Sequence, residues 1–214
     1  MVQDLLIVGA GGLAREVAYV VEDLNELSPT FNVIGYYDNN PDAPAHIHGV
    51  PVLRKTDVQG LPRDTGYLVG IGAPRVKQRA AQEMLELGFA CPAILAHQSS
   101  VIHSTSRRGG GTIFFYNVVA SVDQVLGRFV MVSANSTIGH DATIGDFTTI
   151  SPGCHVSGNV HLGEGVFIGT NATIAENLSV GAWSQIGAGA VVLKDVPAGV
   201  TVVGIPAREV PKHA

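Results

Sequence analysis

The stretch ATIGDFTTISPGCHVSGNVHLGEGVFIGTNATI, residues 142–174, carries an aliphatic residue at every sixth position. Its anchors are Ile144, Ile150, Val156, Leu162, Ile168 and Ile174. The same phase runs without an insertion from Phe114 to Val192, and beyond a break at Arg108 it resumes at Ile102. Gly, Ser or Ala usually follows the anchor. A helix repeats about every 3.6 residues and a simple strand every 2, so neither element explains a period of six.

A six-residue period is typical of a parallel β-helix, in which each hexad supplies one short strand and one turn. The anchors then stack inside, and the small residues four positions after many of them fit the tight corners. The unbroken phase predicts a regular β-helix without long external loops. We assign it residues 93–214, including a C-terminal tail.

Residues 1–92 instead alternate strand and helix signals, which predicts a small Rossmann-like β-α-β domain. We expect strands at residues 5–8, 33–37 and 67–71, a short strand near 50–53 and a helix over 75–87. A second helix follows the turn GAGG, because apolar residues recur there at helical spacing: Leu13, Val17, Val20, Val21 and Leu24. The remainder of 39–66 is expected to be a loop. The fold class is therefore α/β followed by all-β.

The composition excludes several classes of protein. Charged residues make up only 14% of the chain, the formal charge is -5, and no Lys or Arg run is present. Binding to nucleic acid or to an anionic membrane needs clustered cations and is disfavoured. No apolar stretch approaches the roughly 20 residues that span a bilayer, and Cys91 and Cys154 show no metal spacing. We expect a soluble, cytoplasmic protein.

The repeat and its ending GAGAVVLKDVPAGVTVVGIPA, residues 187–207, resemble the left-handed β-helix acyltransferases. With the domain in front, the chain looks like the sialic acid O-acetyltransferases and the nucleotide-sugar N-acetyltransferases of bacterial glycan pathways. The resemblance implies a homotrimer with acetyl-CoA in the groove between neighbouring β-helices. It also implies left-handed coiling, against the usual crossover preference.

His140 and Asp141 occupy two turn positions of the hexad that begins at Ile138, so both side chains should point outward. Acetyl transfer from a thioester needs a base for the attacking hydroxyl or amine, and the ordinary histidine pKa of about 6.5 suits that task. A neighbouring carboxylate can stabilise the imidazolium. The resemblance implies the same roles, although the family more often has Glu after the histidine.

The resemblance also places acetyl-CoA against backbone groups of Gly158, Thr170 and Ala188, with Gly158 as the donor to the oxyanion. Each of the three is also explained by turn geometry alone. The N-acetyltransferases often have a second histidine where this chain has Thr149.

In the first domain, GAGGLA matches G-x-G-x-x-A after a strand. A glycine turn before a helix binds phosphate through backbone N–H groups, so we expect a sugar-nucleotide site there rather than a dehydrogenase. Its expected residues are Gly9, Gly11, Gly12, Leu13, Asp38, Asn39 and Gly72. Leu13 stands where the N-acetyltransferases usually have histidine, which favours a hydroxyl acceptor slightly.

Two alternatives remain open. A trimeric scaffold that binds a nucleotide sugar without catalysis would fit the replaced histidines, although an intact His140 argues against it. A γ-carbonic-anhydrase-like zinc enzyme would need a histidine pair five residues apart, which the β-helix lacks. We predict no metal. His155 and His161, six residues apart, are expected to stack on one outer edge as solvated residues, and Cys154 is expected in the core.

Overall fold

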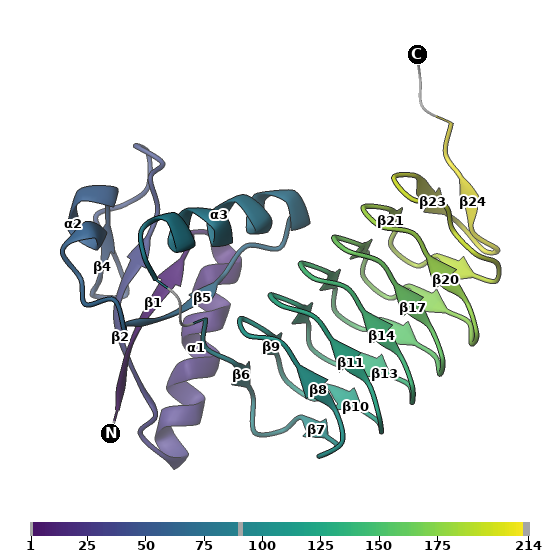
Figure 1. Ribbon diagram of the computed structural model, residues 1–214, viewed down its shortest axis with the longest axis horizontal. Coiled ribbons are helices and arrows are strands. Elements are labelled where there is room, and N and C mark those ends of the chain that lie inside the picture. The colour runs from purple at the N-terminus through teal and green to yellow at the C-terminus, as the bar shows by residue number, and fades with distance from the viewer. Residues whose placement is uncertain (1, 90–91, 212–214) are drawn as a thin grey trace. The chain divides into compact units, whose positions relative to one another are not determined.

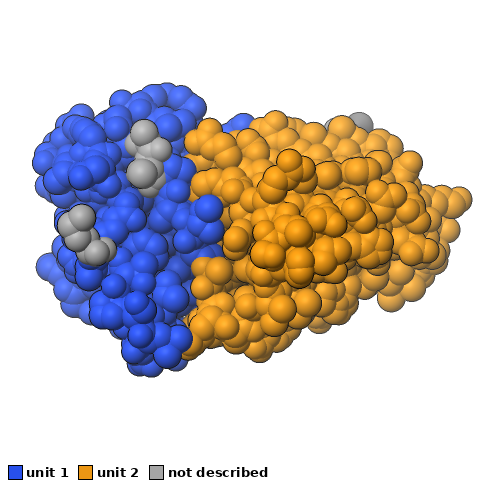
Figure 2. Space-filling view, turned by 60° about the horizontal axis from the view of Figure 1, so that its bottom comes forward, with its two compact units in different colours: residues 1–95 blue, residues 96–214 orange. Residues whose placement is uncertain are grey.

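The computed structural model describes residues 2–89 and 92–211, so Cys91 lies outside the described residues. The chain forms two compact units, residues 1–95 and 96–214 (Figure 2). The predicted boundary lay between residues 92 and 93. No helix in the described part of the chain is long and apolar enough to cross a membrane.

Unit 1 is built on a five-stranded sheet with the order β3-β4-β2-β1-β5 (Figure 1). Its strands are β1 (Gln3–Val8), β2 (Phe31–Tyr37), β3 (His46–Ile47), β4 (Val50–Leu53) and β5 (Gly66–Val69). The pairs β1–β2, β1–β5 and β2–β4 are parallel, whereas β3 is antiparallel to β4. Its helices are α1 (Gly12–Leu27), α2 (Lys55–Gln59) and α3 (Pro74–Glu86). The sequence anticipated neither β3 nor α2, which are short.

Helix α1 packs on the sheet through one apolar stripe, whose buried members are Ala14, Val17, Ala18, Val20 and Val21. The helix comes so close to the end of β5 that a Cβ on Gly70 would lie 2.6 Å from the Ala14 Cα. Only glycine allows this approach. The turn between β1 and α1 is thereby held against the carboxyl edge of the sheet, where ligands bind in parallel α/β sheets.

Unit 2 is a parallel β-helix with three faces (Figure 1). The first face contains β7 (Val101–Ile102), β10 (Val119–Ala120), β13 (Thr137–Ile138), β16 (His155–Val156), β19 (Thr173–Ile174) and β22 (Val191–Val192). The second face contains β8 (Arg107–Arg108), β11 (Val125–Leu126), β14 (Thr143–Ile144), β17 (His161–Leu162) and β20 (Ser179–Val180). The third face contains β6 (Leu95–Ala96), β9 (Ile113–Phe114), β12 (Met131–Val132), β15 (Thr149–Ile150), β18 (Phe167–Ile168), β21 (Gln185–Ile186), β23 (Thr201–Val203) and β24 (Arg208–Glu209).

Each coil takes 18 residues, as the pairing of Thr137 with His155 shows. The anchors from Phe114 to Val192 form a buried core with the small residues of the turns, including Cys154. Arg108 does not break the coil, because it continues β8 while remaining exposed. Four-residue turns join the faces at three corners. The first corner, between the first and second faces, includes turns 121–124, 139–142, 157–160 and 175–178; the third, between the third and first faces, includes turns 133–136, 151–154, 169–172 and 187–190.

Candidate functional site

The first corner carries the predicted catalytic pair. His140 and Asp141 are the second and third residues of turn 139–142, and their side chains are 62% and 60% exposed. His140 Nδ1 lies 2.8 Å from Asp141 Oδ2. A carboxylate only accepts hydrogen bonds, so Nδ1 carries the proton and the Nε2 lone pair is left to act as a base. Asp141 adopts φ 58°, a left-handed conformation that Asp tolerates better than most residues.

Gly158, in the next turn at this corner, lies against the His140 ring. A Cβ at position 158 would lie 2.6 Å from Nε2 and 2.7 Å from Cε1 of His140. The coil ladder uses the N–H groups on either side, since Ser157 donates to Ile174 and Asn159 to His140. In the described part of the chain, no acceptor takes the Gly158 N–H. A backbone donor without a partner and a basic ring nitrogen therefore share one corner.

Thr170 and Ala188 lie at a different corner. They are the second residues of turns 169–172 and 187–190 at the third corner, one coil apart, and Gly189 donates to the Thr170 carbonyl over 2.8 Å. Their own N–H groups also have no acceptor among the described residues. One chain therefore does not bring the three predicted acetyl-CoA contacts together, because Gly158 faces out from the first corner.

The prediction that His155 and His161 stack on one edge is wrong. His155 belongs to β16 on the first face and His161 to β17 on the second, because residues stack every 18 positions and not every six. Each histidine Nδ1 contacts a threonine one coil earlier, Thr137 at 2.9 Å and Thr143 at 2.5 Å. The two histidines thus flank the turn that contains Gly158. A coil of three hexads repeats every 18 residues, so residues six apart lie on different faces; this rule would have placed the two histidines correctly from the sequence.

The expected phosphate site in unit 1 is a turn braced by Asp38. Gly9 has φ +103°, which glycine adopts without strain. The N–H of Ala10 donates to Asp38 Oδ2 over 3.0 Å, and the N–H of Asn40 donates to Asp38 Oδ1 over 2.8 Å. Asp38 thus joins the ends of β1 and β2. The sequence analysis expected Asp38 in the sugar-nucleotide site and did not anticipate that it braces this turn.

The other expected residues of this site lie near the same edge of the sheet. Gly11 is the N-cap of α1, and Gly12 begins the helix. A Cβ on Gly72 would lie 3.3 Å from a methyl group of Leu13, so these two residues are neighbours. Asn39 donates to the Tyr37 hydroxyl over 2.7 Å.

A polar cluster that sequence reasoning missed adjoins Asn39. The Tyr37 hydroxyl donates to Glu83 Oε1 over 2.7 Å, and Lys55 Nζ lies 3.5 Å from the same oxygen. Burial, with the Glu83 hydrogen bond, raises the pKa of Tyr37 to about 12. A pocket of about 510 Å³ opens beside the cluster and is lined by Lys55, Gln78, Arg79, Gln82, Glu83 and Glu86. The residues are spread over 50 positions, so no local motif marks them.

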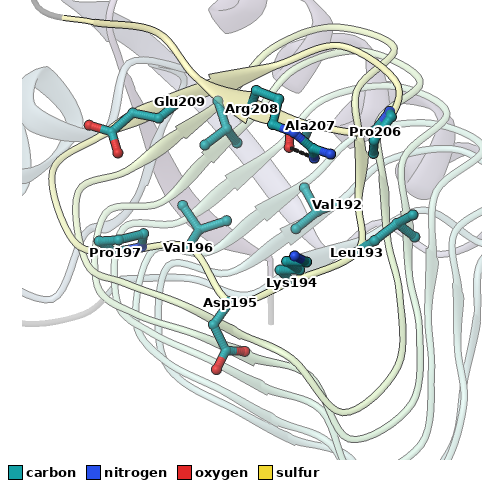
Figure 3. Close-up of a pocket in the computed structure, with 11 residues that line it drawn as sticks. Val192, Leu193, Lys194, Asp195, Val196, Pro197, Pro206, Ala207, Arg208 and Glu209 are labelled. Carbon is teal, nitrogen blue, oxygen red and sulfur yellow. Dashed lines mark hydrogen bonds between the residues drawn. The ribbon is translucent and has the colours of Figure 1, made fainter.

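Another pocket, of about 370 Å³, lies at the C-terminal end of the β-helix (Figure 3). Its apolar wall continues the core through Val192, Val196 and Val202, and Arg208 and Glu209 of β24 line it as well.

Thr149 stands where the N-acetyltransferases often have a second histidine, and it is buried, with 4% of its surface exposed. Among the described residues, no group of three or more His, Cys, Asp or Glu side chains could hold a metal ion.

Comparisons with known proteins cover both units. Residues 4–84 match the family model of the PglD N-terminal domain, and residues 159–194 match that of the bacterial transferase hexapeptide (six repeats). No curated protein matches the chain significantly.

Several solved structures are similar over nearly the whole chain. The acetyltransferase domain of PglB from Neisseria gonorrhoeae FA1090 is 30% identical with a TM-score of 0.88, over 97% of this chain and 100% of that chain. It has also been solved with acetyl coenzyme A. PerB, a perosamine N-acetyltransferase from Caulobacter crescentus, is 26% identical with a TM-score of 0.86 over 99% of both chains, in complex with CoA and GDP-perosamine. WeeI from Acinetobacter baumannii AYE is 28% identical with a TM-score of 0.87, over 97% of this chain and 100% of that chain.

Proposed function

We propose the mechanism by which this chain transfers an acetyl group from acetyl-CoA to a nucleotide-linked sugar. The chain belongs to the family of left-handed β-helix acetyltransferases with a PglD N-terminal domain. The single observation that carries the mechanism is the His140–Asp141 pair against Gly158. One corner combines a base held in one tautomer with a backbone donor, the two groups that acyl transfer from a thioester requires.

The acceptor attacks the thioester carbonyl while His140 Nε2 takes its proton. Asp141, 2.8 Å from Nδ1, stabilises the imidazolium that forms. The Gly158 N–H donates to the oxyanion of the tetrahedral intermediate. The intermediate then collapses, the carbon–sulfur bond breaks, and CoA leaves as a thiolate that takes the proton from His140. The acetyl group passes directly between the substrates. The chain need not form an acyl-enzyme, and its described free cysteine, Cys154, is buried.

The acceptor we favour is an amino group on a nucleotide sugar. PerB is an N-acetyltransferase crystallised with GDP-perosamine, and its similarity extends over both units. The N–H groups of Gly11 and Gly12 would hold the diphosphate at the start of the helix, since those of Gly9 and Ala10 already donate to Tyr37 and Asp38. The second candidate is a hydroxyl acceptor such as a sialic acid, favoured by Leu13 and Thr149 at positions where the N-acetyltransferases often have histidine.

The assembly we propose is a homotrimer. Gly158 lies at the first corner, whereas Thr170 and Ala188 lie at the third, so one chain cannot line an acetyl-CoA groove with all three. A groove between two chains would combine the first corner of one copy with the third corner of the next.

We place the reaction in the cytoplasm, where acetyl-CoA is available.

The experiment that tests the function follows CoA release from acetyl-CoA with a panel of GDP-, UDP- and dTDP-linked amino sugars and of sialic acids. Release with an amino sugar should fall by about 10² to 10⁴ in His140→Ala. Because the His140 side chain is exposed, the unfolding transition of the His140→Ala variant should stay near that of the wild type. Release only with sialic acids would favour the hydroxyl acceptor. Nucleotide-sugar binding without CoA release would favour the non-catalytic scaffold.

A further inference from the structure

Gln124 is a buried amide inside the β-helix, one coil before the catalytic turn. It is the last residue of turn 121–124 at the first corner and is 0% exposed. In the next two coils the same slot holds the apolar Ala142 and Val160. A primary amide in such a column costs free energy unless its hydrogen bonds are made, so its partners explain why it is tolerated.

Every polar atom of the Gln124 amide has a partner. Nε2 donates to the carbonyl oxygens of Ile138 over 3.0 Å and of Gly139 over 3.1 Å. Oε1 accepts a short hydrogen bond from the Ser106 hydroxyl, which belongs to the coil before. Two carbonyl oxygens on one side and a hydroxyl on the other fix which way the amide faces. A chain of hydrogen bonds therefore runs through the interior from Ser106 to the residue before His140.

The Gly139 carbonyl belongs to the peptide that carries the His140 N–H. The turn is also fixed on both sides by the ladder, since Gly139 donates to Val156 and Asp141 donates to Val122. With its carbonyl held by Gln124, the peptide cannot rotate, and the Cα–Cβ direction of His140 is set. This direction decides how the ring lies against Gly158.

Other corners of the β-helix also use an interior side chain as a donor. Its acceptor there is the carbonyl of the first residue of the matching turn in the next coil. The hydroxyl of Thr148, for example, donates to the Gly163 carbonyl over 3.1 Å, at the corner between the second and third faces. At the first corner, however, the slots that would serve the following turns hold Ala142 and Val160, which have no donor. The turn with His140 receives a side-chain amide that reaches two carbonyls.

We propose that Gln124 is a positioning residue, which orients the His140 imidazole through the Gly139 peptide. The inference rests on the proposed function, because it assigns His140 the role of base. Gln124 touches no substrate.

The test is Gln124→Met, which keeps the length of the side chain and removes its hydrogen bonds. The kcat should fall about 10- to 100-fold, since misplacement of a catalytic group by about 1 Å costs about 10²-fold. The KM for acetyl-CoA should change less than about threefold. The matched control is Thr148→Val, which removes a comparable interior bond at another corner and should keep kcat within about twofold. Ser106→Ala, a smaller change, should lower kcat in the same direction if Gln124→Met does not fold.

A double-mutant cycle separates positioning from general loosening of the fold. If Gln124 acts through His140, Gln124→Met should cost nothing further in the His140→Ala background. The same loss in both backgrounds, or a kcat equal to that of Thr148→Val, would overturn the inference while the transferase activity stands. Absence of CoA release by the wild type with every acceptor would overturn the assignment of the reaction itself, and this inference with it.

Discussion

Replacing Gly158 with Ala should slow catalysis about 10²-fold without harming the fold. The new Cβ would lie 2.6 Å from His140 Nε2, whereas an ordinary contact needs about 3.4 Å, so the ring must move by about 0.8 Å. A displacement of this size costs about 10²-fold in rate, which corresponds to about 2.7 kcal/mol of activation free energy. The Gly158 N–H stays in place, so the backbone donor to the oxyanion is retained.

The fold should tolerate the change for two reasons. Gly158 does not have a positive φ, so alanine is not strained there. The His140 side chain is 62% exposed and can rotate into solvent. We expect the free energy of unfolding to change by less than about 1 kcal/mol.

The assay is the initial rate of CoA release at saturating acetyl-CoA and acceptor, with urea unfolding measured in parallel. Gly60→Ala is a control, because its Cβ would meet only the Asp57 carbonyl, at 3.4 Å. A folded Gly158→Ala protein with kcat within about threefold of the wild type would refute the argument that the ring position against Gly158 matters. A loss of rate that matched a loss of stability would assign Gly158 a structural role instead.

Three further predictions concern other parts of the molecule. Asp141→Asn should lower kcat about tenfold or more, because the amide cannot stabilise the imidazolium, while Asn still tolerates the left-handed φ; unchanged kcat would remove Asp141 from the mechanism. Burial lowers the pKa of Lys77 from 10.5 to about 7, so the unfolded chain binds more protons above pH 7 and stability should rise with pH from about 7 to 9.5. Lys77→Met should flatten that rise in urea titrations, and an unchanged slope would contradict it. Gly70→Ala should destabilise unit 1 by about 1–3 kcal/mol, because its Cβ would lie 2.6 Å from the Ala14 Cα; an unchanged calorimetric transition of that unit would show that α1 can yield.

The period of six predicted the β-helix well, because an inward aliphatic residue is required at every strand of every coil. It also predicted that His140 and Asp141 point outward, since both lie in a turn. The contact between His140 and Gly158 depends on the stacking of residues 18 positions apart. The same rule places His155 and His161 on different faces, where the prediction failed.

The features that the sequence did not predict depend on partners far along the chain. Gln124 stands in a slot expected to be apolar, and its acceptor, Gly139, is identified only once the coil length is known. The position of Asp38 in a strand-turn-helix motif predicts a residue that contacts a ligand. Its carboxylate instead accepts hydrogen bonds from the backbone N–H groups of Ala10 and Asn40. Tyr37 and Glu83 meet across 46 positions, which no local spacing indicates.

The coil separates two kinds of sequence change. Inserting six residues between Gly158 and Thr170 would keep every aliphatic side chain inside, yet it would turn all later corners by a third of a revolution and move Thr170 and Ala188 together to another corner. Inserting 18 residues would preserve both the interior and the corners. A gene for such a protein can therefore lengthen by whole coils and still fold with its corners aligned, whereas shorter in-phase insertions would give a folded but inactive protein.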